Sequence, residues 1–368
     1  MKKFILKLIY SILRCEAKTI LAIKKPEIIA VTGSVGKTST KDAIFHLLKD
    51  KFDVYASRGN LNTEIGMPLS IMRYSKTPSK IGYLKVIIFG VFKNLFSYPK
   101  IMILEMGADK PGDIKYLSSF VKPKIAVVTS VGPTHLEFFK TIDAVAKEKS
   151  NLVRSISKKG VVVLNKNDLR VAKMSKLTSA KVKYFSADTK DIYREAAKAV
   201  GKIYGISDAE AKEKLRTFKT PKGRMNIIKA KDYTIIDDSY NSNPLSARVA
   251  LLELSKYKGR KIAILGDMLE QGDYAKRAHN EIGELSGKIC DEVWFVGKYS
   301  DYFFEGAKNK LESKYIKKAK NSLEAAQKVS KIIKPGDTVL IKGSRGVALE
   351  KVVKELTASG EQQAAKGD

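Results

Sequence analysis

Lys37 and Thr38 lie in a short glycine-containing turn that follows an apolar, β-branched run at residues 28–32. A turn of this kind between a strand and a helix lets backbone N–H groups surround phosphate oxygens, and the helix N-terminus adds a partial positive charge. A lysine at this position reaches the β- and γ-phosphates of a nucleotide, and the next hydroxyl binds Mg²⁺. We therefore expect a phosphate loop formed by Gly33, Ser34, Val35, Gly36, Lys37, Thr38 and Ser39.

The glycines of this turn match a shorter pattern than usual, G-x-x-G-K-T, because Gly33 is the only glycine that shortly precedes Gly36. The simplest alternative is an ordinary strand-to-helix turn without a ligand. Apolar residues at 43, 44, 47 and 48 have helical spacing, which gives the turn the strand–loop–helix context of a phosphate loop. This context favours the phosphate loop.

Two further candidate metal ligands follow apolar runs along the chain. Glu105 comes directly after the run at 101–104, and His135 follows the run at 125–128. Parallel strands end at the edge of the sheet where an open α/β fold places its ligand. Taken alone, Glu105 would be a surface carboxylate and His135 a hydrogen-bonded loop residue. Their shared position at strand ends instead favours a joint site with Thr38 for Mg²⁺ and a nucleotide.

Apolar runs of β type alternate with helical segments throughout the chain, which predicts a doubly wound α/β fold. The first series continues to a run at 161–164, a helical stretch at 191–218 and a linker at 219–223. A second series indicates a smaller α/β domain without its own phosphate loop, with runs at 234–236, 262–265, 293–296 and 339–341.

Length and composition set the class of protein. The chain has 368 residues, enough for about two domains. Its formal charge is +30, from 69 basic and 39 acidic residues. We expect no nucleic-acid partner, because only 12 of the basic residues are Arg and no recognition motif is present. A membrane surface or an anionic substrate fits the charge. Cys15 and Cys290 lie far apart, which indicates a reducing compartment and a cytoplasmic location.

Two apolar segments flanked by lysines, at 4–13 and 81–96, lie outside this pattern. The first has the spacing of an amphipathic helix. It is no signal peptide, because Lys7 interrupts it and no small-residue cleavage site follows. Both segments are short for a transmembrane helix. The alternatives are packing on the protein, as a buried helix at 81–96, or contact with a membrane surface.

Several motifs together resemble the Mur ligase family. The central part carries, besides the phosphate loop, GNLNTEIGMP at 59–68, EMGA at 105–108 and GPTHLE at 132–137. The second series is similar to the MurF type, which adds D-alanyl-D-alanine to a UDP-N-acetylmuramoyl-tripeptide, in DDSYNSNP at 237–244, LGDMLE at 265–270 and KGSRG at 342–346. The resemblance extends from about residue 28 to residue 356.

The resemblance implies an α/β fold with a P-loop-containing central domain, built on a mainly parallel sheet, and a smaller Rossmann-like C-terminal domain. We expect four segments along the chain: an N-terminal amphipathic segment at 1–27, the central ATP-binding domain at 28–220, the C-terminal domain at 221–358 and a flexible tail at 359–368.

The family mechanism implies ATP and Mg²⁺ as cofactors and an acyl phosphate as intermediate. Lys37 would neutralise the transferring phosphoryl group, while Thr38 and Glu105 would hold one Mg²⁺ and His135 a second. The family also uses a carbamylated lysine near the second metal, and the matching residue here is Lys149. Carbamylation would turn a cation into a carboxylate-like ligand. The alternative is a surface lysine, and Asn151 stands where the family often has Glu.

The resemblance assigns the remaining nucleotide contacts to both domains. Domain closure would exclude water from the acyl phosphate. The residues expected near the adenosine are Asn165 and Asp168, and those expected to close over the nucleotide are Arg224, Asp237, Tyr240, Asn241 and Asn243.

The implied partners are a UDP-muramoyl-peptide-like acceptor and D-Ala-D-Ala, bound by a monomer. Full-length family members carry an N-terminal domain that holds the UDP-sugar, whereas about 27 residues precede the first predicted strand here. We therefore expect that UDP binding is lost or that another element provides it. Peripheral contact with the inner face of the membrane would be compatible with a cytoplasmic enzyme.

Two other functions compete with cell-wall ligation. One is a superfamily ligase acting on another carboxylate, of the folylpolyglutamate type. The other is a nucleotide-dependent, membrane-associated binding protein whose catalytic half has decayed. The segments at 240–244 and 265–270 favour the cell-wall ligase, and the presence of Lys37, Glu105 and His135 argues against decay.

Overall fold

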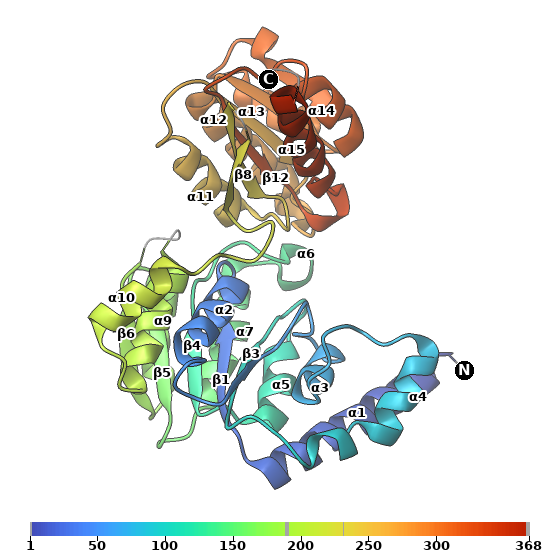
Figure 1. The fold of residues 1–368 in the computed structure, drawn as a ribbon, viewed down its shortest axis with the longest axis vertical. Helices are drawn as coiled ribbons and strands as arrows, with labels where there is room; N and C mark the ends of the chain where they lie inside the picture. Colours follow the sequence, from blue (N-terminus) through green and yellow to red (C-terminus); the bar gives the residue numbers. More distant parts are fainter. Residues whose placement is uncertain (1, 188–190, 231, 366–368) are drawn as a thin grey trace. The chain divides into compact units, whose positions relative to one another are not determined.

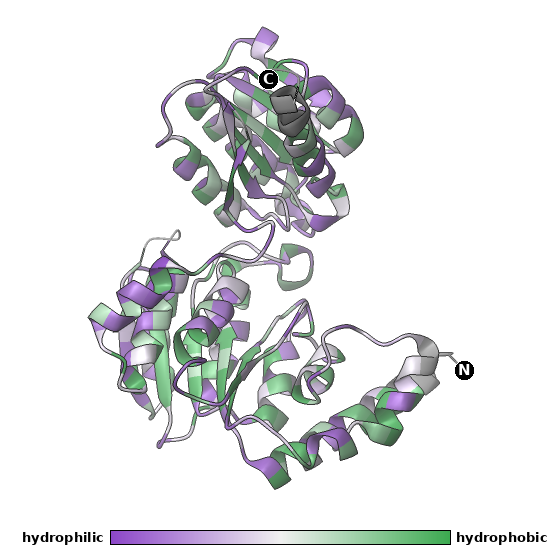
Figure 2. Cartoon of the chain, in the orientation of Figure 1, coloured by the Kyte–Doolittle hydropathy of each residue, from purple (hydrophilic) through white to green (hydrophobic). Residues whose placement is uncertain are grey.

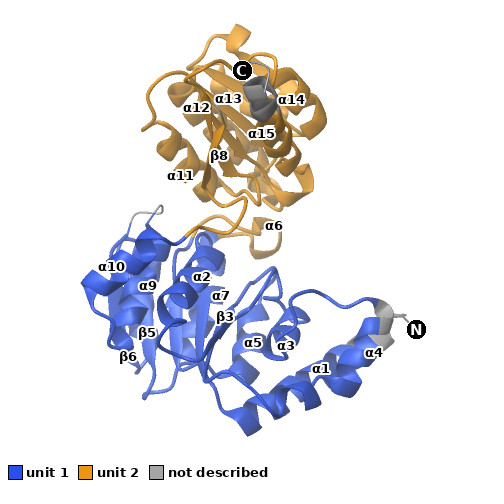
Figure 3. Ribbon diagram, in the orientation of Figure 1, with its two compact units in different colours: residues 1–131, 142–218 blue, residues 132–141, 219–368 orange. Residues whose placement is uncertain are grey.

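A computed structural model describes residues 2–187, 191–230 and 232–365, and the chain divides into two compact units (Figure 3). Unit 1 comprises residues 1–131 and 142–218, and unit 2 comprises residues 132–141 and 219–368. Unit 2 thus begins its second part at the start of the predicted linker. We expected the central domain to be continuous over residues 28–220. The contacts of the segment 132–141 instead place it in unit 2.

Unit 1 is built on a six-stranded parallel sheet with the strand order β2-β3-β1-β4-β5-β6. The strands are β1 (Glu27–Thr32), β2 (Val54–Ala56), β3 (Ile101–Glu105), β4 (Ile125–Val128), β5 (Val161–Asn165) and β6 (Lys181–Phe185). The central strands appear in the sequence as unbroken apolar runs because helices cover both faces of the sheet. Val31 is in register with Glu105, so β1 and β3 end side by side at the phosphate loop.

Helices on both faces of this sheet complete unit 1 (Figure 1). One core cluster joins α2 and α9 to the sheet through Ile44, Leu47 and Val200. On the other side of the unit, α1 and α4 lie side by side, away from α9 and α10. The helices are α1 (Lys2–Lys24), α2 (Lys37–Leu48), α3 (Gly66–Ile71), α4 (Lys80–Phe89), η1 (Phe92–Asn94), α5 (Asp113–Val121), α7 (Ile142–Arg154), α8 (Leu169–Ala172), η2 (Lys173–Leu177), α9 (Ile192–Ile203) and α10 (Asp208–Arg216).

Unit 2 contains a second six-stranded sheet with the order β11-β10-β9-β12-β8-β7, parallel except for β7. Its strands are β7 (Asn226–Ala230), β8 (Tyr233–Asp238), β9 (Lys261–Gly266), β10 (Glu292–Val296), β11 (Ile316–Ala319) and β12 (Thr338–Lys342). Its helices are α6 (Leu136–Phe139), α11 (Pro244–Leu254), η3 (Gly272–Tyr274), α12 (Ala275–Ile289), α13 (Ser300–Ala307), η4 (Ser313–Tyr315), α14 (Ser322–Val329), η5 (Arg345–Val347) and α15 (Glu350–Ala365). Two apolar clusters fill the two faces of the sheet.

The predicted α/β fold class, with two such sheets, is therefore confirmed. Three local features differ from expectation. The N-terminal helix continues to Lys24, and the apolar segment at 81–96 divides into α4 and η1. The tail predicted from Ser359 is helical as far as Ala365, and its last three residues lie outside the described residues. Across the described part of the chain, every helix is too short or too polar to cross a membrane.

Candidate active site

The phosphate loop connects β1 to α2, and its geometry requires both glycines. Gly36 directly precedes α2 with a left-handed φ of 83°, a conformation that an L side chain disfavours. A Cβ atom at Gly33 would lie 1.8 Å from the hydroxyl oxygen of Thr129, the residue that follows β4. Any other residue at Gly33 would therefore push the loop away from the end of β4.

Residues that follow β4 hold the phosphate loop in place. The Val35 N–H donates a hydrogen bond to the Ser130 hydroxyl at 2.9 Å, and the Thr129 hydroxyl donates one to the Val35 carbonyl at 2.6 Å. The Lys37 ammonium curls back and donates to the Gly33 carbonyl at 2.7 Å. The shape of the loop and the direction of its lysine are thus set by hydrogen bonds within the protein.

Thr38 and Glu105 meet at the edge of the sheet. The Thr38 hydroxyl, in the first turn of α2, donates a hydrogen bond to Oε2 of Glu105 at 2.7 Å. The Asn62 side-chain amide donates to Oε1 of the same carboxylate at 2.9 Å, and Glu105 is 4% exposed. Hydroxyl and carboxylate oxygens are the hard donors that Mg²⁺ prefers. The residues present therefore fit this metal ion, and two predicted ligands lie together.

Lys149 is a buried residue of α7, not the surface lysine of the alternative interpretation. Its side chain is 3% exposed, and within the described part of the chain no hydrogen bond or ion pair involves its amine. Burial, together with the positive charge of Lys37, lowers the pKa of Lys149 to about 7. The neighbouring Glu148 carboxylate raises it but is itself occupied, because it accepts hydrogen bonds from the N–H groups of Gly112 and Ile114.

His135 belongs to unit 2, where it pairs with Glu270. Its backbone has a left-handed φ of 52°, and its Nδ1 lies 2.7 Å from Oε2 of Glu270. The Glu137 N–H donates to the Glu270 carbonyl at 3.1 Å, which fixes the same loop a second time. The hydrogen bond from His135 lowers the pKa of Glu270. That His135 lies near the phosphate loop of unit 1 stays a prediction.

The two residues expected near the adenosine have structural roles in unit 1. Asp168 caps α8 by accepting hydrogen bonds from two N–H groups of its first turn, and it also accepts one from the Val131 N–H at 2.7 Å. Asn165 is 2% exposed and donates to the carbonyls of Thr129 and Ala187. Their approach to a nucleotide stays a prediction.

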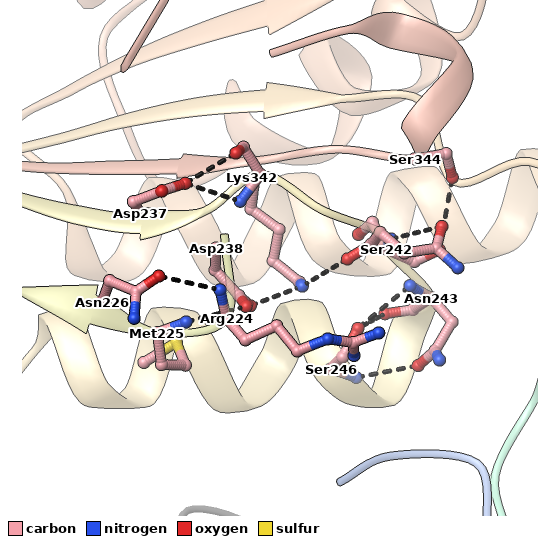
Figure 4. A network of polar contacts seen from close by, with 12 residues as sticks. Arg224, Met225, Asn226, Asp237, Asp238, Ser242, Asn243, Ser246, Lys342 and Ser344 are labelled. Atoms are coloured by element: carbon pink, nitrogen blue, oxygen red, sulfur yellow. Dashed lines mark hydrogen bonds and ion pairs between the residues drawn. The ribbon is translucent and has the colours of Figure 1, made fainter. Parts of the chain in front are cut away.

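A buried ion pair lies at the carboxyl ends of β8 and β12 in the sheet of unit 2 (Figure 4). The Lys342 ammonium, at the end of β12, lies 2.6 Å from a carboxylate oxygen of Asp238 and donates to the Asn241 carbonyl at 2.9 Å. Lys342 is 1% exposed. Burial raises the pKa of Asp238, and the charge of Lys342 opposes this shift. The pair holds the loop after β8, which carries several predicted nucleotide contacts.

The other predicted residues of unit 2 surround this loop. The Arg224 guanidinium lies over the Tyr240 ring, 4.2 Å from its centroid, an arrangement that favours a cation–π interaction. Asn243 caps α11 and exchanges hydrogen bonds with Ser246 in a capping box. Asp237 is buried and accepts two hydrogen bonds from Ser239. Arg224 and Tyr240 thus present a stacked surface, whereas Asn243 and Asp237 shape the loop.

Asn62, Glu270 and Lys342 take part in these arrangements but were not predicted as site residues. Each lies inside a motif that marked the family resemblance. The motifs therefore already contained these three residues, but the residue that each one contacts could be found only in the folded chain.

Comparison with known proteins identifies both units. The family model described as "Mur ligase middle domain" matches residues 31–231, and the one described as "Mur ligase, glutamate ligase domain" matches residues 223–345. The first match alone covers more than half of the chain. This chain belongs to the Mur ligase family.

Relatives of this Mur ligase share its sequence over most of its length. It is 28% identical over 382 residues to the UDP-N-acetylmuramoyl-tripeptide–D-alanyl-D-alanine ligase of Bacillus subtilis, with 93% of this chain and 78% of the relative covered. It is 30% identical over 379 residues to the protein of the same name from Buchnera aphidicola, with 89% and 75% covered.

Solved structures agree with this assignment. A MurF ligase from Thermotoga maritima in complex with ADP has a TM-score of 0.82 and 26% identity, covering 96% of this chain and 84% of that one. A folylpolyglutamate synthase from Mycobacterium tuberculosis, also complexed with ADP, has a TM-score of 0.68 and 14% identity, covering 94% of both, and shows the shared fold alone. The predicted family is thus confirmed, and the Mur ligase is a nucleotide-dependent ligase.

Proposed function

We propose that this Mur ligase joins D-alanyl-D-alanine to the terminal carboxylate of a muramoyl-tripeptide-type acceptor, with conversion of ATP to ADP and phosphate. The relatives named for this reaction support the substrates, since the chain covers at least 75% of each. The observation that carries the proposal is the contact of Thr38 with Glu105 next to Lys37. These residues supply the charge and the oxygen donors that phosphoryl transfer requires.

The reaction has two steps. An acceptor carboxylate oxygen bonds to the γ-phosphorus of ATP while the bond from that phosphorus to the β–γ bridging oxygen breaks, and ADP leaves. The amine of D-alanyl-D-alanine then bonds to the acyl carbon, and the tetrahedral intermediate expels phosphate as the carbon–oxygen bond breaks. The amine loses its proton to solvent, and an amide remains. Lys37 stabilises the charge on the transferring phosphoryl group.

Thr38 and Glu105 would hold Mg²⁺, which supplies neutralisation of phosphate charge when it is bound. Among the described residues, no three His, Cys, Asp or Glu side chains gather into a metal-binding cluster. This fits Mg²⁺, which typically binds to one or two carboxylates and completes its shell with phosphate oxygens and water. Asn62 keeps the Glu105 carboxylate turned toward Thr38.

We assign Lys149 the carbamylated role that the family resemblance implies. The amine nitrogen bonds to the carbon of CO₂ and loses a proton, which leaves a carbamate with two oxygen donors. Its burial and its nearness to the charge of Lys37 support this assignment, since both disfavour the ammonium form. His135, oriented by Glu270, would serve the same second metal ion.

Unit 2 would supply the second wall of the nucleotide site. Arg224 and Tyr240 form a flat, cationic surface that suits a nucleotide base or phosphate. Asn241 and Asn243 lie on the loop that Lys342 and the capping box hold. Closure of the two units over ATP would protect the acyl phosphate from water.

The proposed partners are small molecules: the muramoyl-peptide acceptor, which we expect to be UDP-linked, D-alanyl-D-alanine and ATP. A monomer in the cytoplasm would carry out the reaction.

The test is ADP release under matched conditions. The wild-type enzyme should release ADP with D-alanyl-D-alanine and UDP-muramoyl-tripeptide together, and far more slowly with ATP alone. Equal rates would contradict the proposed substrates. A rate that rises with glutamate and a folate instead would show that the ligase acts on another carboxylate.

A further inference from the structure

The inward face of α4 and η1 is buried against the rest of unit 1. Val86, Gly90 and Asn94 follow one another at intervals of four residues and are all buried. A Cβ atom at Gly90 would lie 2.7 Å from the Met72 sulfur, so this face packs closely on the end of α3. Asn94 donates to the carbonyls of Met72 and Gly90 and accepts from Arg73. The helix is therefore held in a defined orientation.

The outward side of α4, η1 and the bend that follows them is apolar. We define the α4 patch as the five side chains Leu84, Ile88, Phe89, Phe92 and Phe96, which are between 59 and 83% exposed. Figure 2 shows α4 as one of the most hydrophobic helices at the surface of unit 1. A surface helix ordinarily points its polar side outward. In α4 the exposed side is apolar as well as the buried side. Exposed apolar patches of this kind mark surfaces that bind another protein or a membrane.

The chain segment that carries the α4 patch has charges of a single sign, and Glu16 of α1, which lies against Gly90 on the inward face, has a buried carboxylate oxygen. Residues 65–104 contain no acidic residue, and their six basic residues are Arg73, Lys76, Lys80, Lys85, Lys93 and Lys100. Lys85 and Lys93 are exposed among the patch residues. The Lys93 ammonium lies 4.8 Å from the centroid of the Tyr74 ring, which keeps it beside the helix.

We propose that the α4 patch lies in the headgroup region of an anionic lipid bilayer, with Lys85, Lys93 and Lys100 at the lipid phosphates. A short helix with exposed Phe, Leu and Ile and flanking lysines can lie in the membrane interface without crossing it. The charge complementarity favours a lipid surface over a second copy of this chain, because a copy would bring the same cations against the patch. The proposal is independent of the ligase reaction.

The experiment is co-sedimentation of the full chain with vesicles. Vesicles of mixed phosphatidylcholine and phosphatidylglycerol should bind the protein at low salt, and binding should fall as salt rises. Vesicles of phosphatidylcholine alone should bind it much more weakly. Phe89→Glu combined with Phe92→Glu should lower the apparent partition coefficient by at least about tenfold, since two large apolar side chains are lost and two negative charges are added.

Leu252→Glu combined with Leu323→Glu is the matched control, because both leucines are exposed in unit 2 and the charge change is the same. The single change Phe96→Glu, at the most exposed residue of the patch, gives a second variant with little risk to folding. Thermal melting and nucleotide binding verify the fold of each protein. Failure of the wild type to bind anionic vesicles at low salt, or equal binding by the patch variants, would overturn the proposal. Dimers that Phe96→Glu dissociates, without vesicle binding, would make a second copy the occupant instead.

Discussion

The Thr38 hydroxyl lies 2.7 Å from a carboxylate oxygen of Glu105, whose other oxygen accepts a hydrogen bond from Asn62 at 2.9 Å. Thr38 belongs to α2 and Glu105 to β3, so two elements fix the pair, and the loop before α3 fixes the carboxylate from the other side. Both oxygens of this buried carboxylate therefore have set directions. An oriented carboxylate binds a metal ion with less loss of side-chain entropy than a free one.

Asn62→Ala should weaken Mg²⁺ binding without removing a direct ligand. Because residues that orient metal ligands contribute about tenfold or more to affinity, the Mg²⁺ concentration for half-maximal ADP release should rise about tenfold. Activity at saturating Mg²⁺ should largely return. Asn309→Ala, at an exposed position of unit 2, is the control. An unchanged Mg²⁺ dependence would show that Asn62 does not orient Glu105.

Lys37→Ala should abolish turnover. The phosphoryl charge would lose its counterion, at a cost on the order of 3 kcal/mol or more in transition-state stabilisation. Steady-state ADP release measures this loss, and Lys49→Ala, an exposed residue that follows α2, is the control. Ligation at the wild-type rate by Lys37→Ala would reject the phosphate-loop assignment.

Lys149→Ala should be inactive and should regain part of its activity with acetate, which replaces the missing carboxylate oxygens. Removal of CO₂ and bicarbonate should also slow the wild-type enzyme, and added bicarbonate should restore it. Acetate should have no such effect on Lys37→Ala. Full activity of Lys149→Ala in the absence of acetate would exclude the carbamate.

Glu16 of α1 makes stability depend on pH. Its Oε2 is buried and has no hydrogen-bond partner in the described part of the chain, and burial raises the pKa of Glu16 to about 7. The unfolded chain loses this proton near pH 4, so the free energy of unfolding should fall as the pH rises from about 4 to 7 and level off above that. Solvent access to the residue limits the effect to about 1–2 kcal/mol.

Glu16→Gln should remove this dependence and raise the free energy of unfolding at alkaline pH. Urea denaturation on both sides of the window compares the variant with the wild type. Glu213→Gln, whose side chain is 67% exposed, should keep the wild-type dependence. If Glu16→Gln and the wild type respond to pH alike, the carboxyl group is solvated in the folded protein.

The fold was largely predictable because buried parallel strands are written as apolar runs. The runs at β1, β3, β4 and β5 follow this rule. The strands that the sequence did not reveal, such as β6, β7 and β11, lie at or next to sheet edges and carry lysines. Such charges protect edges from pairing with other chains, and they also hide a strand from a search for apolar runs.

Pairs of residues were harder to predict than single residues. Lys342 and Asp238 meet because β12 and β8 are neighbours in register, and this order of strands cannot be read from spacing. His135 meets Glu270 through two loops that are distant in the sequence. The sequence also did not decide whether the segment at 81–96 is buried or exposed, because apolar composition alone does not separate a buried helix from an interfacial one.

The central claim is that the acceptor carboxylate passes through an acyl phosphate, and an isotope measurement tests it most directly. The acceptor carries a heavy oxygen isotope at both oxygens of its terminal carboxylate and reacts with ATP and D-alanyl-D-alanine. Mass spectrometry should find one labelled oxygen in the released phosphate for each amide formed, because the bond that breaks in the second step joins the acyl carbon to that oxygen. Amide formation with unlabelled phosphate would contradict the account.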